Sequence, residues 1–190
     1  MAIQQLFISS NEHLGRVVDQ IRPDQWALML PERASRNPQD LRAAIAYHAF
    51  DDAWVPDVLA GRTAEEVGVR FEPILDSADP APVYRDHNQR ARDAVAAFDD
   101  LEAVTHLSYG DFPAREFLQH VTSFRIVRTF DVARLIGVDP AFEPDFLRAI
   151  ESEYEPLLEQ YRAMGVFPDP IIVDDAAPLG TRVMAMFGRD

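Results

Sequence analysis

The stretch PAREFLQHVTSFRIVRTFDVARLI, residues 113–136, decides the fold class of this chain. Pro113 suits the first turn of a helix, and Gly137, directly after the stretch, is typical of a helix end. Between them apolar residues recur at spacings of three and four, which predicts one face directed to a core. Arg128 lies in the middle of that face, whose apolar members are Phe117, Val121, Phe124, Val132 and Leu135. We therefore expect a long helix in a mostly α-helical protein.

Four further segments show helical spacing or helix start and stop residues: Gln4–Ile21, 37–60, Val83–Phe98 and Pro144–Met164. Asn37 is expected to cap the second of them, with Pro38 in its first turn. Pro56 and Pro156 are expected to bend the helices that contain them. The remaining predictions are irregular chain over 62–82 and 105–111, extended chain over 167–178, and a last helical turn or strand over 181–187.

Long amphipathic helices without a convincing series of alternating strands indicate a four-helix bundle. The chain has 190 residues, which is enough for one domain with a sizeable core. We expect a single domain in which residues 1–165 form the bundle. Residues 166–190 are expected to form a C-terminal extension packed on the same domain.

The amino-acid composition argues against several kinds of binding partner and several kinds of chemistry for this protein. The formal net charge is -14, every basic residue is Arg, and there is no Cys. An acidic surface repels phosphate backbones, so a nucleic-acid partner is not expected. The lack of Cys excludes disulfides, thiolate catalysis and Cys-based zinc sites. No apolar run approaches the roughly 20 residues that span a bilayer, and the first residues do not resemble a signal peptide. We therefore expect a soluble, cytoplasmic protein without a membrane partner.

Arg128 is out of place on an apolar helix face. A guanidinium keeps its charge, and burying it without partners costs several kcal/mol. One explanation is structural: Arg128 pairs with Asp131 or reaches the rim of the bundle. The other is a polar pocket in which Arg128 meets an anionic ligand or a buried acid. Arg125 and His120 lie one and two turns earlier, roughly along the same side, and would belong to that pocket.

The second helix carries its own polar cluster, formed by Tyr47, His48, Asp51 and Asp52. His48 and Asp52 are four residues apart, so they are placed to form a hydrogen-bonded pair on one face. A histidine in such a place is more often a satisfied core residue than a ligand or a base. The other histidines, which show no partner at a useful spacing, are expected on the surface: His13, His87 and His106.

Several segments, in the right order, resemble the mycothiol-dependent maleylpyruvate isomerase-like family of the wider DinB/YfiT-like superfamily. They are DDAWVPDVLAGRT at 51–63, HLSYGD at 106–111, FDVAR at 130–134, and the end of the chain at 182–189. The resemblance covers nearly the whole chain. It implies a DinB/YfiT-like four-helix bundle with a short C-terminal extended or helical appendage.

The resemblance also implies a divalent metal, usually zinc or nickel, that works with mycothiol. The metal would be held by a His from one helix and by an acid and a His four residues apart on another. In this chain the three ligand positions fall on Tyr47, Phe124 and Arg128. His48 is adjacent to the first of them but lies about 100° around the helix. A cation at a metal position repels the metal. We therefore expect no metal there, and an anion bound to Arg128 with Tyr47 opposite.

The first functional hypothesis is a metal-independent enzyme of isomerase, cyclase or lyase type that acts on a small anionic metabolite. Its predicted catalytic residues are Tyr47, His48, His120 and Arg128. Its predicted substrate-binding residues are Asp51, Trp54, Phe124 and Arg125. No cofactor is predicted; zinc or nickel and mycothiol enter only through the resemblance.

Three other hypotheses stay open. The chain is a non-catalytic small-molecule binding or resistance protein, or it is a structural partner in which Arg128 is paired with Asp131 or Asp51. The third alternative keeps the metal and thiol chemistry of an isomerase or transferase through shifted ligands such as His48, His120 and Asp51. An exposed face around Phe50 or Trp54 would support a homodimer.

Overall fold

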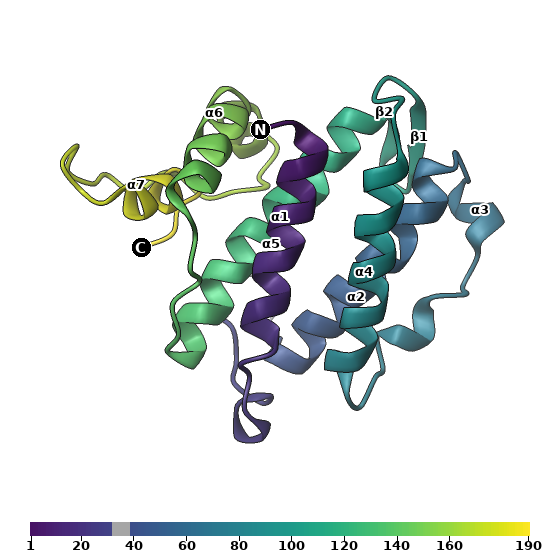
Figure 1. Cartoon of the computed structure of the whole chain (residues 1–190), viewed down its shortest axis with the longest axis horizontal. Helices are drawn as coiled ribbons and strands as arrows, with labels where there is room; N and C mark the ends of the chain where they lie inside the picture. The colour runs from purple at the N-terminus through teal and green to yellow at the C-terminus, as the bar shows by residue number, and fades with distance from the viewer. Residues whose placement is uncertain (32–38) are drawn as a thin grey trace.

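The computed structural model describes residues 1–31 and 39–190, and these are mostly helical (Figure 1). The long helices are α1 (Ile3–Val18), α2 (Leu41–Leu59), α4 (Pro80–Ala97), α5 (Ala114–Ile136) and α6 (Pro144–Ala163). The short elements are η1 (Pro23–Gln25), α3 (Ala64–Val67), η3 (Glu72–Ile74) and α7 (Leu179–Met186), with strands β1 (Val104–Leu107) and β2 (Gly110–Pro113). The expected all-α class is confirmed in this coarse form. None of the described helices is both long and apolar enough to cross a membrane.

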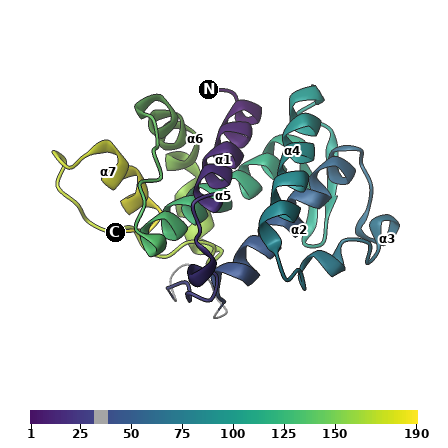
Figure 2. The same ribbon diagram turned by 60° about the horizontal axis from the view of Figure 1, so that its bottom comes forward.

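The helices α1, α2, α4 and α5 lie side by side. α1 packs against α5 and α4, and α2 packs mainly against α4 and makes a smaller contact with α5 (Figure 1). α6 and α7 lie together on the far side of α1 from α4, as the turned view also shows (Figure 2). The small contact between α2 and α5 includes buried polar side chains of both helices, such as Asp52 and Arg125.

Two apolar clusters hold these helices together. The first lies mainly among α1, α5, α6 and α7 and contains Phe7 and Tyr154, both fully buried. The second lies among α1, α2, α4 and α5 and contains Leu14 and Ile45. Phe187, next to α7, is also fully buried in the first cluster, so the C-terminal segment packs onto the core of the helices.

The segment 105–111, expected to be irregular, belongs instead to an antiparallel hairpin. Thr105 pairs with Phe112 in the register of β1 and β2, and the Thr105 hydroxyl donates to the Phe112 carbonyl at 2.8 Å. The strands are four residues long, which is too short for a clear alternating pattern. The hairpin leads directly into α5 and places its turn beside that helix.

The predicted helix ends are shifted by a few residues at several places. α4 begins at Pro80 rather than Val83, since prolines in the first turn need no backbone N–H there. α1 ends at Val18 rather than Ile21. α2 begins at Leu41, with the Asp40 carboxylate accepting from the Ala43 N–H at 2.8 Å. The predicted cap and first-turn residues at positions 37 and 38 lie outside the described residues.

The C-terminal segment was expected to be extended before a last turn or strand. Residues 167–178 form no strand, and their contact with α7 includes a hydrogen bond from the Ile171 N–H to the Ala185 carbonyl at 2.9 Å. The last element is helical. α3 and η3 fall within 62–82, where irregular chain was expected.

Candidate functional site

The fully buried guanidinium on α5 belongs to Arg125, not to Arg128 as expected. Arg125 is 0% exposed and its Nε donates to Asn11 Oδ1 at 2.8 Å and to Asp52 Oδ1 at 3.0 Å. Its terminal nitrogens donate to the Asp52 carboxylate and, at 2.8 Å, to the Val121 carbonyl. The charge is therefore matched by an ion pair and by neutral acceptors, as a buried guanidinium requires.

Asp52 extends this network to α4. Asn88 donates to Asp52 Oδ2 at 3.4 Å, to the Tyr84 hydroxyl at 2.8 Å and to the Asn11 carbonyl at 3.3 Å. Burial raises the pKa of Asp52, and the Arg125 guanidinium opposes that rise. The expected pair between His48 and Asp52 is therefore wrong, because Asp52 faces Arg125 and Asn88. This network of buried side chains connects α1, α2, α4 and α5.

Arg128 lies one turn after Arg125 and is partly buried. Its Nε donates to Nε2 of His48 at 3.2 Å, a contact that links α5 to α2. Burial and the charges of both arginines hold the pKa of His48 well below its ordinary value, so the ring is neutral. Since Nε2 accepts, Nδ1 carries the proton, and it finds no hydrogen-bond partner among the described residues. His48 therefore orients Arg128 and is poorly suited to act as a base.

Asp131, an acid expected beside Arg128, favours the ionised form of Arg128 and also forms an ion pair with another arginine. Its two carboxylate oxygens accept from Nε of Arg189 at 3.1 and 3.2 Å, and both side chains are almost fully buried. This contact ties the C-terminal end of the chain to α5. Arg189 was not predicted, since nothing in the sequence pattern connects positions so far apart.

Asp51 is the acid with the most unusual environment. Burial raises its pKa to about 7, against the opposing charge of Arg125, and the neighbouring Asp52 charge acts in the same direction as burial. Arg128 also favours the ionised form. The charge of Asp51 in turn raises the pKa values of Tyr47 and Tyr109. Asp51 thus lies among two arginines and two phenols, where α2, α5 and the hairpin meet.

His120 lies on α5 near the hairpin, where Tyr109, from the segment expected to be irregular, contacts it. The Tyr109 hydroxyl is 3.2 Å from His120 Nδ1, and Glu116 is 3.6 Å from His120 Nε2. Burial lowers the pKa of His120, while Glu116 opposes that fall. Burial and the charge of Asp51 raise the pKa of Tyr109 to about 12. Tyr109 therefore connects the surroundings of Asp51 with those of His120.

A small cavity of about 70 Å³ lies beside His120 and is lined by Ser123, Phe124, Tyr161, Met164 and Val166. The hydroxyl of Tyr161 is buried and has no hydrogen-bond partner in the described part of the chain. Phe124 is 45% exposed, so its expected place on the core-facing side of α5 is wrong. It lies at the edge of this cavity instead.

Trp54 belongs to a row of aromatic rings. Its ring contacts Phe50 and Phe71 at 6.0 Å between centroids, and Phe71 also contacts His87. These rings form a row on α2, α4 and the segment between them. Phe50 also contacts Tyr47 at 6.2 Å between centroids, so the row reaches a predicted catalytic residue.

Two histidines expected on the surface have partners. His13 is only 2% exposed, stacks on Phe146 at 4.4 Å and lies 2.9 Å from a carboxylate oxygen of Glu143. Burial lowers its pKa. His106 lies 2.8 Å from Asp111 across the hairpin. Neither histidine contacts the site on α2 and α5.

The residues at the three positions where the sequence resemblance implied metal ligands do not fit a metal. Tyr47 and Phe124 are about half exposed and offer no imidazole or carboxylate, and Arg128 is a cation. Within 1–31 and 39–190, no three His, Asp or Glu side chains are grouped so that they could hold a metal ion. The shifted set of His48, His120 and Asp51 is therefore not brought together as a ligand group.

No family model, curated protein or solved structure matches this chain. The site is accordingly interpreted from its own contacts. The structure gathers Tyr47, His48, Asp51 and Arg128, which we call the α2–α5 site, and Arg125 lies one turn before Arg128 on α5. His120 and Phe124 form a neighbouring group, reached through Tyr109.

Proposed function

We propose that this chain is an enzyme that transfers a proton on a small anionic metabolite at the α2–α5 site. The observation that carries the proposal is the meeting of a fixed cation, Arg128, with an acid whose pKa is raised to about 7, Asp51. A guanidinium binds carboxylate or enolate oxygens, and an acid that is about half ionised at neutral pH both accepts and donates a proton. Isomerisation, cyclisation or a lyase-type step would use this pair.

The reaction follows from these roles. Arg128 binds the carboxylate and the carbonyl oxygen of a 2-oxo acid. Asp51 removes a proton from the adjacent carbon, so that a C–H bond breaks, an O–H bond forms on Asp51, and the electron pair moves to the oxygen beside Arg128. Return of the proton to carbon regenerates the carboxylate and completes an isomerisation. His48 keeps Arg128 in place, and the hydroxyl of the half-exposed Tyr47 donates a hydrogen bond to the substrate.

Relationship to the maleylpyruvate isomerase-like family and its DinB/YfiT-like bundle is part of this proposal. The order of the motifs supports it, as does the side-by-side packing of α1, α2, α4 and α5. A divalent metal does not fit the side chains of Tyr47, Phe124 and Arg128, and the proposed steps use neither a metal nor mycothiol. The proposal therefore describes a divergent relative in which a guanidinium replaces the ion.

A purely structural role for Arg128 explains less. Arg125 of α5 and Asp52 of α2, both 0% exposed, form the buried ion pair that holds the helices together. Arg128 is only partly buried, it contacts the neutral His48 ring, and the charges of Asp131 and Asp51 favour its ionised form. A guanidinium that is not fully enclosed by protein is suited to an anionic ligand.

Ligand binding is tested by the melting temperature of the protein with added pyruvate or maleate at neutral pH. Both anions should raise the melting temperature of the wild type, and Arg128→Ala should lose the rise. The matched control is Arg148→Ala, an exposed arginine of α6, which should behave as the wild type. An unchanged rise in Arg128→Ala would overturn the anion site.

Catalysis is tested separately by exchange of the methyl protons of pyruvate with deuterium from the solvent, followed by proton NMR. The wild type should accelerate exchange, and Asp51→Asn should abolish the acceleration while anion-dependent stabilisation remains. A protein that binds the anions but never accelerates exchange is the non-catalytic binding protein of the alternative hypothesis. That outcome would refute the enzymatic proposal.

A further inference from the structure

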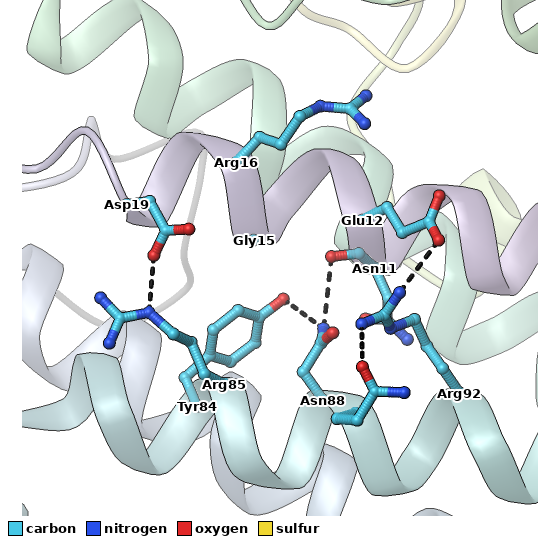
Figure 3. Close-up of a pocket in the computed structure, with 10 residues that line it drawn as sticks. Asn11, Glu12, Gly15, Arg16, Asp19, Tyr84, Arg85, Asn88 and Arg92 are labelled. Atoms are coloured by element: carbon cyan, nitrogen blue, oxygen red, sulfur yellow. Dashed lines mark hydrogen bonds and ion pairs between the residues drawn. The ribbon is translucent and has the colours of Figure 1, made fainter.

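A groove of about 400 Å³ lies between α1 and α4 and shares no lining residue with the α2–α5 site (Figure 3). It is lined by Asn11, Glu12, Gly15, Arg16 and Asp19 of α1 and by Tyr84, Arg85, Asn88, Gln89 and Arg92 of α4. Its volume falls within the range of small-molecule sites in proteins. None of the residues proposed for proton transfer lines it.

The inner part of the groove is polar and buried. Asn11, Tyr84 and Asn88 are each 5% exposed or less. The side-chain nitrogen of Asn11 has no hydrogen-bond partner within the described chain, while its oxygen accepts from Arg125. A buried amide N–H without an acceptor is costly, and a ligand oxygen in the groove would supply the acceptor. Asn88 holds the Tyr84 hydroxyl at 2.8 Å, so the polar groups have fixed positions.

Gly15 keeps the groove open. It lies in the middle of α1, where glycine is less favourable than alanine because the unfolded chain loses more freedom. A helix glycine at an interface usually allows a close approach of the neighbouring backbone. A Cβ added to Gly15 would meet nothing within 4 Å, so close packing does not explain this residue. Figure 3 shows Gly15 on the part of α1 that faces Tyr84 and Arg85 of α4.

The charges on the rim are already paired across the groove. Arg85 Nε is 2.6 Å from Asp19, and Arg92 is 2.9 Å from Glu12 (Figure 3). Arg16 is drawn pointing away from α4. An ion entering the groove would have to compete with one of these pairs, whereas a neutral molecule leaves both intact.

We propose that the α1–α4 groove binds a small neutral molecule rich in hydroxyl groups, of the size of one sugar ring. Hydroxyl oxygens accept from the Asn11 amide, and hydroxyl protons donate to the side-chain oxygen of Asn88. The paired charges of the rim exclude acids and amines of the same size. This site is separate from the α2–α5 site and does not depend on the function proposed for it.

Binding is tested by titrating the purified protein with D-glucose and myo-inositol and following the side-chain amide signals of Asn11 and Asn88 by heteronuclear NMR. At least one of the two neutral probes should shift these signals in a saturable way. D-gluconate and D-glucosamine, which carry a charge on a similar skeleton, should bind more weakly. No saturable shift with either neutral probe, or tighter binding of a charged one, would overturn the proposal.

A matched pair of variants separates binding in the groove from a surface effect. Gly15→Leu fills the groove and should weaken binding of the neutral probe by about tenfold or more, whereas Gly15→Ala should change it little. Gln89→Phe fills the groove from the opposite helix and is the second test if Gly15→Leu folds poorly. Undiminished binding in a folded, filled variant would show that the probe binds elsewhere and would refute the assignment.

Discussion

Replacement of Asp51 by Asn should make the stability of the protein less dependent on pH. The folded protein raises the pKa of this carboxyl from 3.8 to about 7, chiefly through burial. Between these values the unfolded chain has released the proton and the folded chain keeps it. The folded state therefore binds more protons, so the free energy of unfolding falls as the pH rises through this window. The contribution is complete below about pH 4 and is lost above about pH 7.

The size of the effect follows from the shift. One pKa unit corresponds to about 1.4 kcal/mol, so a rise of about three units sets an upper limit of about 4 kcal/mol. Asp51 is only partly buried and solvent screens it, so we expect about 2 kcal/mol. The asparagine side chain does not titrate. Relative to the wild type, Asp51→Asn should therefore gain about 2 kcal/mol between roughly pH 4 and pH 8.

The assay is urea-induced unfolding followed by circular dichroism at several pH values across this window. Urea is preferred because guanidinium chloride would screen the charges. The matched control is Asp175→Asn, an exposed aspartate of the C-terminal segment, whose difference from the wild type should not vary with pH. Parallel stability curves for the wild type and Asp51→Asn would refute the raised pKa, and with it the proposed acid–base role.

Three further substitutions test the packing by urea unfolding. Arg125→Ala should lower the free energy of unfolding by about 3–5 kcal/mol because it leaves the Asp52 charge buried without its partner. The double variant Arg125→Met, Asp52→Leu should recover most of this stability. Equal losses of stability in the single and the double variant would contradict the buried ion pair. Gly188→Ala should lower the free energy of unfolding by about 2 kcal/mol, because φ is +71° there and the new Cβ would lie 2.5 Å from Pro168 Cγ. A variant as stable as the wild type would contradict the left-handed conformation of Gly188. Gly15→Ala should gain about 0.5–1 kcal/mol because the added Cβ meets nothing within 4 Å, and a loss of stability would contradict the open space beside Gly15.

Local signals in the sequence were sufficient for the helices. α5 was predicted from Pro113 to Ile136 and is observed from Ala114 to Ile136, because a proline at its start and a glycine at its end act within one turn. Gly137 has φ +76°, the left-handed conformation that ends many helices. Such signals need no knowledge of the rest of the chain.

Contacts between distant residues were not available from the pattern. His13 is buried because Phe146 and Glu143, at the start of α6, close over it. The ion pair of Asp131 with Arg189 likewise depends on where the C-terminal segment returns to α5. Spacing along one helix contains no information about a partner more than 50 residues away.

The face of α5 was misjudged for a related reason. Counting apolar residues selects the face with Phe124 and Arg128, whereas the buried face includes Thr122, Arg125 and Thr129. These polar side chains are buried because each has a place in the structure: Arg125 meets Asp52 and Asn11, and the Thr129 hydroxyl donates to the Arg125 carbonyl at 2.7 Å. A hydrophobic count treats such residues as exposed unless their partners on other helices are known.

The buried face of α5 is shifted by about one residue from the predicted face. As a result, Arg125 joins the helices and Arg128 is left to meet a ligand, whereas the sequence pattern alone allows both roles for Arg128. Arg125 is enclosed by Asp52 and by neutral acceptors and joins the helices, so its charge is already used. Arg128, one turn further along, is close enough to solvent to meet a ligand and is held by a neutral His48. If the two roles were exchanged, Arg128→Ala would unfold the protein and Arg125→Ala would only weaken binding of anions. The opposite pattern is what the buried pair requires.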